Sequence, residues 1–338
     1  MNKKILSFGE LLLRVCPGGD WLQDNTLPFY VGGAEANVAT ALALWGLPSA
    51  YFTALPDNGM TREIAVYLQE KGIDTSRIAW QGERLALYYL PKGKDLKNAG
   101  VIYDRAHSSF STLTPGSIDW DSVLGDIGWL HFSAISPALN RNAAKVCEEM
   151  LQAAAKKEIF ISVDLNYRAK LWQYGATPTE IMPALVEHCH LVMGNLWAVE
   201  KMLGIPVDHS LVATDTKKDY LQHAWLTSEQ VIQNFPKIRY VANTFRFDHG
   251  EKGIRYYTTI YTDKTLFHSK EYLSEKILDK VGSGDCFMAG LIYGLQTNQP
   301  IQQTLEFATA AAYQKLFIPS DATDQRVGDI QKFMETHE

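Results

Sequence analysis

The chain has 338 residues, of which 46% are hydrophobic and 21% are charged, and its formal net charge is −6. This length allows one large domain or two modest ones with a sizeable buried core, and the composition is ordinary for a globular protein. The negative charge argues against a nucleic-acid partner, because binding nucleic acid requires clustered Lys and Arg. No run of 18 apolar residues occurs, so we expect no membrane span.

The chain contains four cysteines that are far apart and form no C-x-x-C pair: Cys16, Cys147, Cys189 and Cys286. This usage predicts free thiols in a reducing compartment. The N-terminal stretch MNKKILSFGE reads as the start of a strand and lacks the apolar run and the cleavage site of a signal peptide. We therefore expect a cytoplasmic protein.

Short runs rich in Val, Ile and aromatic residues alternate with helical patterns along the chain. The short runs predict strands at 4–9, 50–55, 129–134, 159–165, 190–195 and 239–245. The helical patterns lie at 34–45, 61–71 and 143–157. Gly46 and Gly72 follow the first two patterns, as is typical of helix ends. Alternating strands and helices indicate βαβ units, and hence a parallel sheet with helices on both faces.

Two regions break this alternation. Residues 11–33 and 84–106 hold Gly, Pro and Asn turns between short strand-like runs, which predict hairpins in a small sheet appended to the α/β core. The polar residues 206–230 are expected to form a surface insertion. No internal repeat, low-complexity tract or linker divides the chain, so we expect a single domain over residues 1–338.

The stretch VGSGD (281–285) stands directly before an apolar helical pattern. Gly282 and Gly284 permit positive φ and close approach to a ligand, and a helix N-terminus presents unpaired N–H groups to an anion. An acidic side chain there is stabilised as the anion, so Asp285 should be ionised and able to accept a proton from a hydroxyl. Phe287 excludes a dinucleotide-binding G-x-G-x-x-G fingerprint, and no P-loop motif occurs in the chain.

The same stretch is also compatible with an ordinary turn in which the aspartate only caps a helix. A second stretch, YVGGAEANVATALALWG (30–46), again places a glycine pair at a helix start, with Asn37 one turn in. Together the two stretches resemble the signature regions of the PfkB, or ribokinase-like, carbohydrate kinases. The resemblance covers nearly the whole chain and includes DLNYR (164–168) and GNLWAVEKMLG (194–204).

The resemblance implies a three-layer αβα sandwich with a mostly parallel central sheet and a small β-sheet lid formed by about residues 11–33 and 84–112. It also implies ATP as phosphate donor, Mg²⁺ as its metal, and a homodimer or higher homo-oligomer formed through the lid. In such a kinase Asp285 would be the general base. The charge on the transferred phosphoryl group would be held by Gly282, Ser283 and Gly284.

The resemblance further implies nucleotide-binding residues. These would be Asn166, Arg168, Asn195, Gly250, Gly282, Ser283 and Gly284. The chain departs from the family's Asp-Thr-x-Gly-Ala-Gly-Asp pattern, because Lys280 and Ser283 stand at its second and fifth places. In the family's Asn-x-x-Glu motif Asn195 matches, whereas Ala198 stands at the glutamate's place and Glu200 follows two residues later. The metal ligands are therefore left unassigned.

Arg105 in VIYDRAHSSFS and Arg168 in DLNYRAKLW each stand near a tyrosine and an aspartate or asparagine. A guanidinium is better matched to a carboxylate than to neutral hydroxyls, and the combination resembles 2-keto-3-deoxygluconate kinases. That resemblance implies ATP-dependent phosphorylation of this sugar acid to its 6-phosphate. The substrate would be bound by Gly33, Tyr89, Tyr103, Arg105, Arg168, Asp285 and Asp321.

Three alternatives stay open. Arg105 could pair with Asp104 or with another lid carboxylate, which would remove it from substrate binding. The chain could be a fructokinase or another neutral ketose kinase of the same family. It could also be a non-catalytic sugar-binding regulatory protein on the same scaffold.

Overall fold

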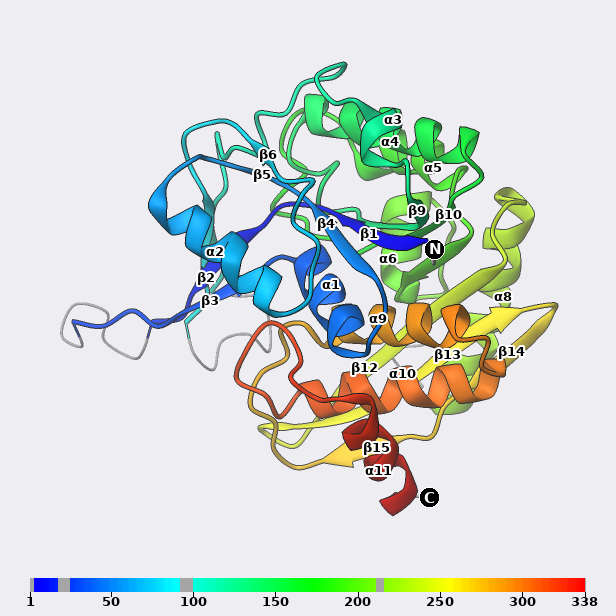
Figure 1. Cartoon of the computed structure of the whole chain (residues 1–338). Coiled ribbons are helices and arrows are strands. Elements are labelled where there is room, and N and C mark those ends of the chain that lie inside the picture. Colours follow the sequence, from blue (N-terminus) through cyan, green and yellow to red (C-terminus); the bar gives the residue numbers. More distant parts are fainter. Residues whose placement is uncertain (1–2, 18–24, 92–99, 211–215, 338) are drawn as a thin grey trace.

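The protein is described by a computed structural model that covers residues 3–17, 25–91, 100–210 and 216–337 (Figure 1). A mostly parallel sheet forms its centre. The strands of this main sheet are β1 (Lys4–Phe8), β4 (Ser49–Phe52), β9 (Ile127–Ser133), β10 (Phe160–Asp164), β11 (Leu191–Gly194), β12 (Tyr240–His249), β13 (Gly253–Thr262), β14 (Thr265–His268) and β15 (Tyr272–Ser274). Their spatial order is β14-β13-β12-β11-β10-β9-β1-β4, and β15 pairs with β13.

The strands from β4 across the sheet to β12 are parallel to their neighbours, whereas β13 is antiparallel to β12, β14 and β15. The parallel strands are short apolar runs that are buried along nearly their whole length, as expected where helices cover both faces. All parallel strands in such a sheet end at one edge, and that edge is the usual place for a ligand.

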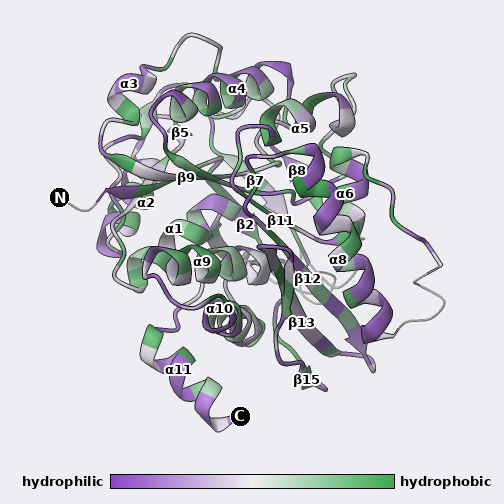
Figure 2. Ribbon diagram, turned by 90° about the vertical axis from the view of Figure 1, so that its right-hand side faces the viewer, coloured by the Kyte–Doolittle hydropathy of each residue, from purple (hydrophilic) through white to green (hydrophobic). Residues whose placement is uncertain are grey.

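Helices cover both faces of the main sheet (Figure 2). One layer contains α1 (Ala34–Leu44), α9 (Ser283–Gln296), α10 (Ile301–Lys315) and α11 (Val327–Thr336). The opposite layer contains α3 (Trp120–Val123), α4 (Arg141–Lys156), α5 (Pro178–Val186), α6 (Leu196–Leu203) and α8 (Lys217–Asn234). Each layer buries its own apolar cluster against the sheet. A third cluster lies beneath α2 (Gly59–Glu70).

A small sheet stands beside the α/β core. Its strands are β2 (Leu12–Val15), β3 (Phe29–Gly32), β7 (Ala86–Tyr89) and β8 (Ile102–Asp104), in the order β3-β2-β7-β8. These strands come from the two segments predicted to form hairpins, although residues 18–24 and 92–99 of those segments lie outside the described residues. A short parallel pair, β5 (Ala54–Leu55) and β6 (Ala79–Trp80), completes the strands. The predicted three-layer sandwich with a small lid sheet is therefore confirmed.

The predicted surface insertion at 206–230 is wrong for its second half, which forms most of α8; residues 211–215 lie outside the described residues. Tyr220 and Ala224 on this helix are buried and pack with Phe245 and Tyr257 of the sheet. The apolar stripe is narrow and is interrupted by polar residues, so composition alone concealed it.

Among the described residues no helix is both long enough and apolar enough to cross a membrane. All four cysteines lie within the described ranges, and each is a free thiol. Three of them are buried and Cys16 is half-buried.

Candidate active site

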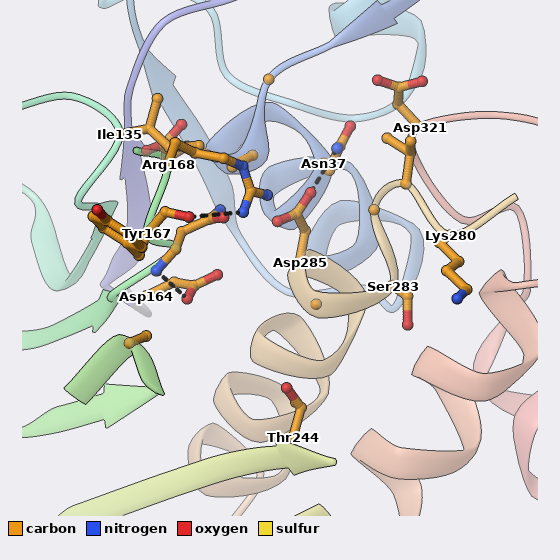
Figure 3. Close-up of a pocket in the computed structure, with 18 of the residues that line it drawn as sticks. Asn37, Ile135, Asp164, Tyr167, Arg168, Thr244, Lys280, Ser283, Asp285 and Asp321 are labelled. Atoms are coloured by element: carbon orange, nitrogen blue, oxygen red, sulfur yellow. Dashed lines mark hydrogen bonds between the residues drawn. The ribbon is translucent and has the colours of Figure 1, made fainter. Parts of the chain in front are cut away.

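A cavity of about 380 Å³ lies between the lid sheet and the carboxyl ends of the parallel strands (Figure 3). Asp164 at the end of β10 and Gly194 at the end of β11 line its floor. Helices α1, α6 and α9 all begin at its wall. Side chains of the lid strands β7 and β8 line the cavity as well. The sheet, three helix N-termini and the lid therefore meet at one site.

The turn before α9 lines this cavity. Gly282 is the N-cap residue of α9 with φ of 78°, and no side chain caps the helix. A Cβ at Gly282 would lie 1.8 Å from the carbonyl oxygen of Asp321, so both the backbone angle and the packing require glycine. A Cβ built at Gly284 would have no atom of the described residues within 4 Å, and Gly284 lines the cavity. The first amides of α9 lack intrahelical partners and are available to an anion in the cavity.

The hydroxyl of Ser283 takes no part in this arrangement, because its Oγ donates to the carbonyl oxygen of Ala312 at 3.1 Å. The Ser283 hydroxyl is therefore already used as a donor, so its backbone amide is the group that it can offer to an anion. This hydrogen bond joins the start of α9 to α10.

Asp285 follows the turn and lines the cavity. Asn37 of α1 donates from Nδ2 to Asp285 Oδ2 at 2.7 Å (Figure 3), across 248 residues of sequence. Burial raises the pKa of the Asp285 carboxyl above its usual range, and Asn37, Arg168 and Lys315 partly oppose that rise. The expectation of an easily ionised aspartate therefore left out burial, which affects the pKa of this carboxyl more than its neighbours do. A raised pKa brings a carboxylate closer to that of an efficient general base near neutral pH.

Two further carboxyl groups lie close to Asp285. Glu35 is buried and accepts hydrogen bonds from Ser133 N at 2.9 Å and Ser133 Oγ at 2.6 Å. Burial raises the pKa of Glu35 to about 7. Burial, followed by repulsion from Asp285, raises the pKa of Asp164 to about 7 as well. Neighbouring carboxyls of this kind oppose one another's ionisation, so burial and the proximity of negative charges both raise the pKa values of Glu35 and Asp164.

The two arginines selected from the sequence have different environments. Arg105 is buried, and its Nε donates to Glu10 Oε2 at 2.5 Å. Glu10 also accepts a short hydrogen bond from Ser108 Oγ. Arg105 thus pairs with a carboxylate of the core and not with Asp104, which instead pairs with Arg84. Its terminal nitrogens form no hydrogen bond to any described residue, and Arg105 lines the cavity.

Arg168 is half-buried and donates from Nη1 to the carbonyl oxygen of Tyr167 at 3.2 Å. It forms no ion pair with a carboxylate among the residues that the structure describes. Figure 3 shows its guanidinium directed toward Asp285. This position agrees with the effect of its charge, which lowers the pKa of Asp285.

On the lid strand β7, Tyr88 lines the cavity and Tyr89 does not. Successive side chains of a strand point to opposite faces, so only one of the two tyrosines can face the ligand. Tyr88 Oη donates to Asp321 Oδ2 at 3.1 Å, and Tyr103 on β8 lines the cavity beside it. Tyr88, and not the Tyr89 selected from the sequence, is therefore the tyrosine of β7 that lines the cavity. Asp321 does line the cavity.

Four other residues selected from the sequence are distributed as follows. Gly33 precedes α1 and lines the cavity, as do Asn166 and Asn195. Asn195 caps α6 by accepting from Ala198 N at 2.8 Å. Gly250 lies at the turn between β12 and β13 and does not line the cavity.

Among the described residues next to Ala198 in the sequence, no acidic side chain lines the cavity in place of the glutamate of the family's Asn-x-x-Glu motif. Ala198 lines the cavity where the family's glutamate would stand, whereas Glu200 points elsewhere and accepts from Val207 N and His209 Nε2. Within the described ranges no group of three His, Cys, Asp or Glu side chains is placed to hold a metal ion. Lys280 is buried and its Nζ lies 2.8 Å from Asp248 Oδ1.

The comparisons with known proteins agree with this geometry. Residues 2–323 match the pfkB family carbohydrate kinases, so the chain belongs to that family and is a carbohydrate kinase. It is 25% identical over 326 residues to the 2-dehydro-3-deoxygalactonokinase of Haloferax volcanii, a match that covers 95% of this chain and 93% of that protein.

Solved structures show the same likeness. The crystal structure of 2-dehydro-3-deoxygluconokinase from Thermotoga maritima is 32% identical, with a TM-score of 0.88 and coverage of 98% of this chain and 99% of that one. A fructokinase from Xylella fastidiosa with bound ATP is 17% identical, with a TM-score of 0.77 and coverage of 100% and 99%. The latter likeness establishes a shared fold.

Proposed function

We propose that the chain transfers the γ-phosphate of ATP to the 6-hydroxyl of 2-keto-3-deoxygluconate, with Asp285 as general base. Asp285 would accept the hydroxyl proton while that oxygen attacks the γ-phosphorus and ADP leaves. Asn37 would hold the carboxylate in position through its 2.7 Å hydrogen bond. The amides of Gly282, Ser283 and Gly284 would hold the charge that accumulates on the transferred group.

The acid specificity of this proposal depends mainly on Arg105. In an extended six-carbon acid the carboxyl carbon and C6 lie about 6 Å apart. If C6 is placed at Asp285, the carboxylate must therefore contact a group farther away. Arg105 lines the same cavity from the lid side and has terminal nitrogens that no described residue occupies. It can bind a carboxylate with two parallel hydrogen bonds.

Arg168 is assigned to the phosphoryl end of the substrate. Its charge acts on Asp285, and a cation there would stabilise both the ionised base and the transferred group. Gly33, Tyr103 and Asp321 would complete the sugar subsite. Tyr88 takes the place first given to Tyr89, because it is the tyrosine of β7 that reaches the cavity.

The nucleotide would lie along the starts of α6 and α9, beside Asn166 and Asn195. The uncapped backbone amides at the start of α9 and the side-chain amides of Asn166 and Asn195 can donate hydrogen bonds to phosphate oxygens. This wall therefore suits ATP. Magnesium supplies charge neutralisation to the phosphates in phosphoryl transfer. Because the described residues offer no cluster of three metal-ligating side chains, phosphate oxygens and water would be its main ligands.

The test is ADP release with Mg-ATP and a set of matched acceptors. 2-Keto-3-deoxygluconate and its C4 epimer are compared with 3-deoxyfructose, which replaces the carboxylate by a hydroxymethyl group, and with fructose. We expect kcat/KM for an acid to exceed that for 3-deoxyfructose by about 100-fold, because with the neutral sugar the terminal nitrogens of Arg105 have no carboxylate to bind, although Arg105 keeps its ion pair with Glu10. Equal values for the acid and for 3-deoxyfructose would remove the argument for a sugar-acid substrate.

Substitutions assign this preference to Arg105. Arg105→Ala should lower kcat/KM for the acid by about 10- to 100-fold, the value of a charged hydrogen bond, and affect 3-deoxyfructose by only a few fold. Arg105→Lys retains a charge opposite Glu10 and separates the loss of the planar fork from the loss of charge. Tyr89→Phe is the control, because Tyr89 lies outside the cavity.

A neutral ketose is the second candidate substrate. One observation favours it: Glu10 already pairs with Arg105, which reduces the positive charge that the lid presents to an acid. With a fructokinase, fructose would give the highest kcat/KM of the set, and Arg105→Ala would affect all acceptors alike.

We also propose that the lid pairs two or more copies of the chain. Phe29 on β3 and Ile102 on β8 are 60% and 53% exposed, and these strands are the outer ones of the described lid sheet. Large apolar groups on edge strands favour pairing with another surface. Light scattering measures the mass in solution, and Phe29→Asp should lower it to that of one chain.

A further inference from the structure

A lysine lies fully buried at the last turn of α10. The side chain of Lys315 has no exposed surface, and its Nζ donates to the carbonyl oxygen of Ile318 at 3.1 Å. Burial of an ammonium group is costly unless other charges compensate it. The proposed chemistry does not use this group, and the sequence analysis did not select it.

Lys315 lies directly behind the turn that faces the phosphates. A Cβ built at Gly282 would come within 3.3 Å of Lys315 Cε and within 1.8 Å of the carbonyl oxygen of Asp321. The outer face of the turn therefore packs on the lysine side chain and on the loop after α10, while the inner face borders the cavity. The charge of Lys315 reaches the site, because it lowers the pKa of Asp285.

The lysine belongs to a buried cluster of four charged groups. Arg14 of the lid strand β2 bridges Asp279 Oδ2 and Asp321 Oδ1, each at 2.6 Å. Both carboxyls raise the pKa of Lys315, in opposition to the larger lowering by burial. Asp279 also accepts from Val281 N at 2.9 Å, which attaches the cluster to the turn.

With all four groups ionised, the formal charges of this cluster sum to zero only if Lys315 is included. Two carboxylates and one guanidinium leave one negative charge when all three are ionised. That charge would lie immediately behind the amides of residues 282–284, where an anion has to bind. An uncompensated negative charge at this place opposes phosphate binding, because charges in a protein interior are weakly screened.

We propose that the Lys315 ammonium is a positioning residue, which neutralises the Arg14–Asp279–Asp321 cluster behind the turn and keeps the turn attractive to the phosphoryl group. It acts through the turn and does not contact the substrate. This inference rests on the proposed role of residues 282–284 as the phosphate-holding amides. The wild-type enzyme then needs no small cation at this position, because its own ammonium group fills it.

The test replaces Lys315 by Met, which has nearly the same shape and leaves room for about one non-hydrogen atom in place of Nζ. The kcat of Lys315→Met should fall on the order of 100-fold, as when one transition-state donor is removed, with the KM for the sugar little changed. The affinity of the sugar-free enzyme for tripolyphosphate, measured by calorimetry, should fall about 10-fold. Lys332→Met is the control, because Lys332 is an exposed lysine on α11.

Chemical rescue separates a charge effect from a packing effect. Ammonium chloride should raise the kcat of Lys315→Met at least 10-fold. Tetramethylammonium chloride at the same ionic strength should not raise it, because that cation is too large for the space that the missing Nζ leaves. Wild-type kcat should be the same in both salts. A folded variant with kcat within twofold of wild type, or one that ammonium does not rescue, overturns the inference.

The inference also stays testable if Lys315→Met does not fold. The wild-type comparison then decides it, since more than 10-fold activation by ammonium over tetramethylammonium would show that the position is not already filled by a cation. Absence of ADP release by the wild type with every sugar acid and ketose would refute the proposed function itself. When Lys315→Met does fold, the tripolyphosphate titration tests the role of Lys315 without turnover.

Discussion

Replacement of Asp285 by Asn tests the chemistry most directly. The amide has the shape of the carboxylate but cannot accept the proton of a sugar hydroxyl. The hydrogen bond from Asn37 Nδ2 can be retained, because the side-chain oxygen of an asparagine at 285 also accepts. The substitution therefore removes the base and leaves the packing of the cavity in place.

The expected loss follows from the role of a general base, which contributes about 10²- to 10⁴-fold to the rate. At about 1.4 kcal/mol for each factor of ten, this is about 3–5 kcal/mol of barrier. The KM for ATP should not rise, because the positive charges of Arg168 and Lys315 that now act on Asp285 would attract the nucleotide phosphates more strongly. A fall in kcat without a rise in this KM is the expected signature.

The assay is steady-state ADP release at saturating acceptor, together with a thermal unfolding curve. Asp263→Asn is the control, because Asp263 is exposed in the turn between β13 and β14. The acid limb of the wild-type pH–rate profile should lie above the ordinary pKa of an aspartate, since burial raises that of Asp285, and it should disappear in the variant. A kcat within tenfold of wild type would refute the assignment of Asp285 as base.

Two further predictions concern the same cavity. Gly282→Ala should destabilise the fold by more than about 2 kcal/mol, because its Cβ would meet the carbonyl oxygen of Asp321 at 1.8 Å. Gly284→Ala should fold normally and lose only nucleotide affinity. Equal urea unfolding midpoints for the two variants would contradict this prediction. Folding raises the pKa of Glu35 from 4.5 to about 7 by burial, so its stabilising contribution is full below about pH 4.5 and is lost as the pH rises through about 7. Glu35→Gln stays neutral at every pH, so its free energy of unfolding should exceed that of the wild type by about 2 kcal/mol at pH 8 and by much less at pH 5. Urea titrations at the two pH values measure this difference. An equal difference at both would contradict the raised pKa of Glu35.

The parts of the fold that were predicted correctly depend only on residues that are close together in the sequence. Apolar runs bounded by glycine turns predicted the parallel strands, and the paired hairpin segments predicted the lid sheet. The helix α8 was missed because Tyr220 and Ala224 form a stripe too narrow to stand out among polar residues. Patterns within a short stretch of sequence predict a helix that buries a broad apolar face, and they miss a helix that buries only a few side chains.

The candidate site likewise contains features that a short stretch of sequence predicts and features that only the packing decides. VGSGD alone indicated uncapped amides followed by a carboxylate at a helix start, and α9 begins there. The sequence analysis selected Tyr89 of β7, but which side chains of a strand face a ligand is set by the packing of the strand. Only the fold selects Tyr88.

By itself, the sequence determined the α/β alternation, the lid segments, the glycine turn before α9 and the candidate base, because each depends on a short stretch of the chain. The tertiary structure alone decided which charges meet. Asn37 reaches Asp285 across 248 residues, and Glu10 reaches Arg105 across 95. Burial then raised the pKa values of Glu35 and Asp164. Ion pairing and desolvation depend on distances between remote segments, and no local pattern encodes those distances.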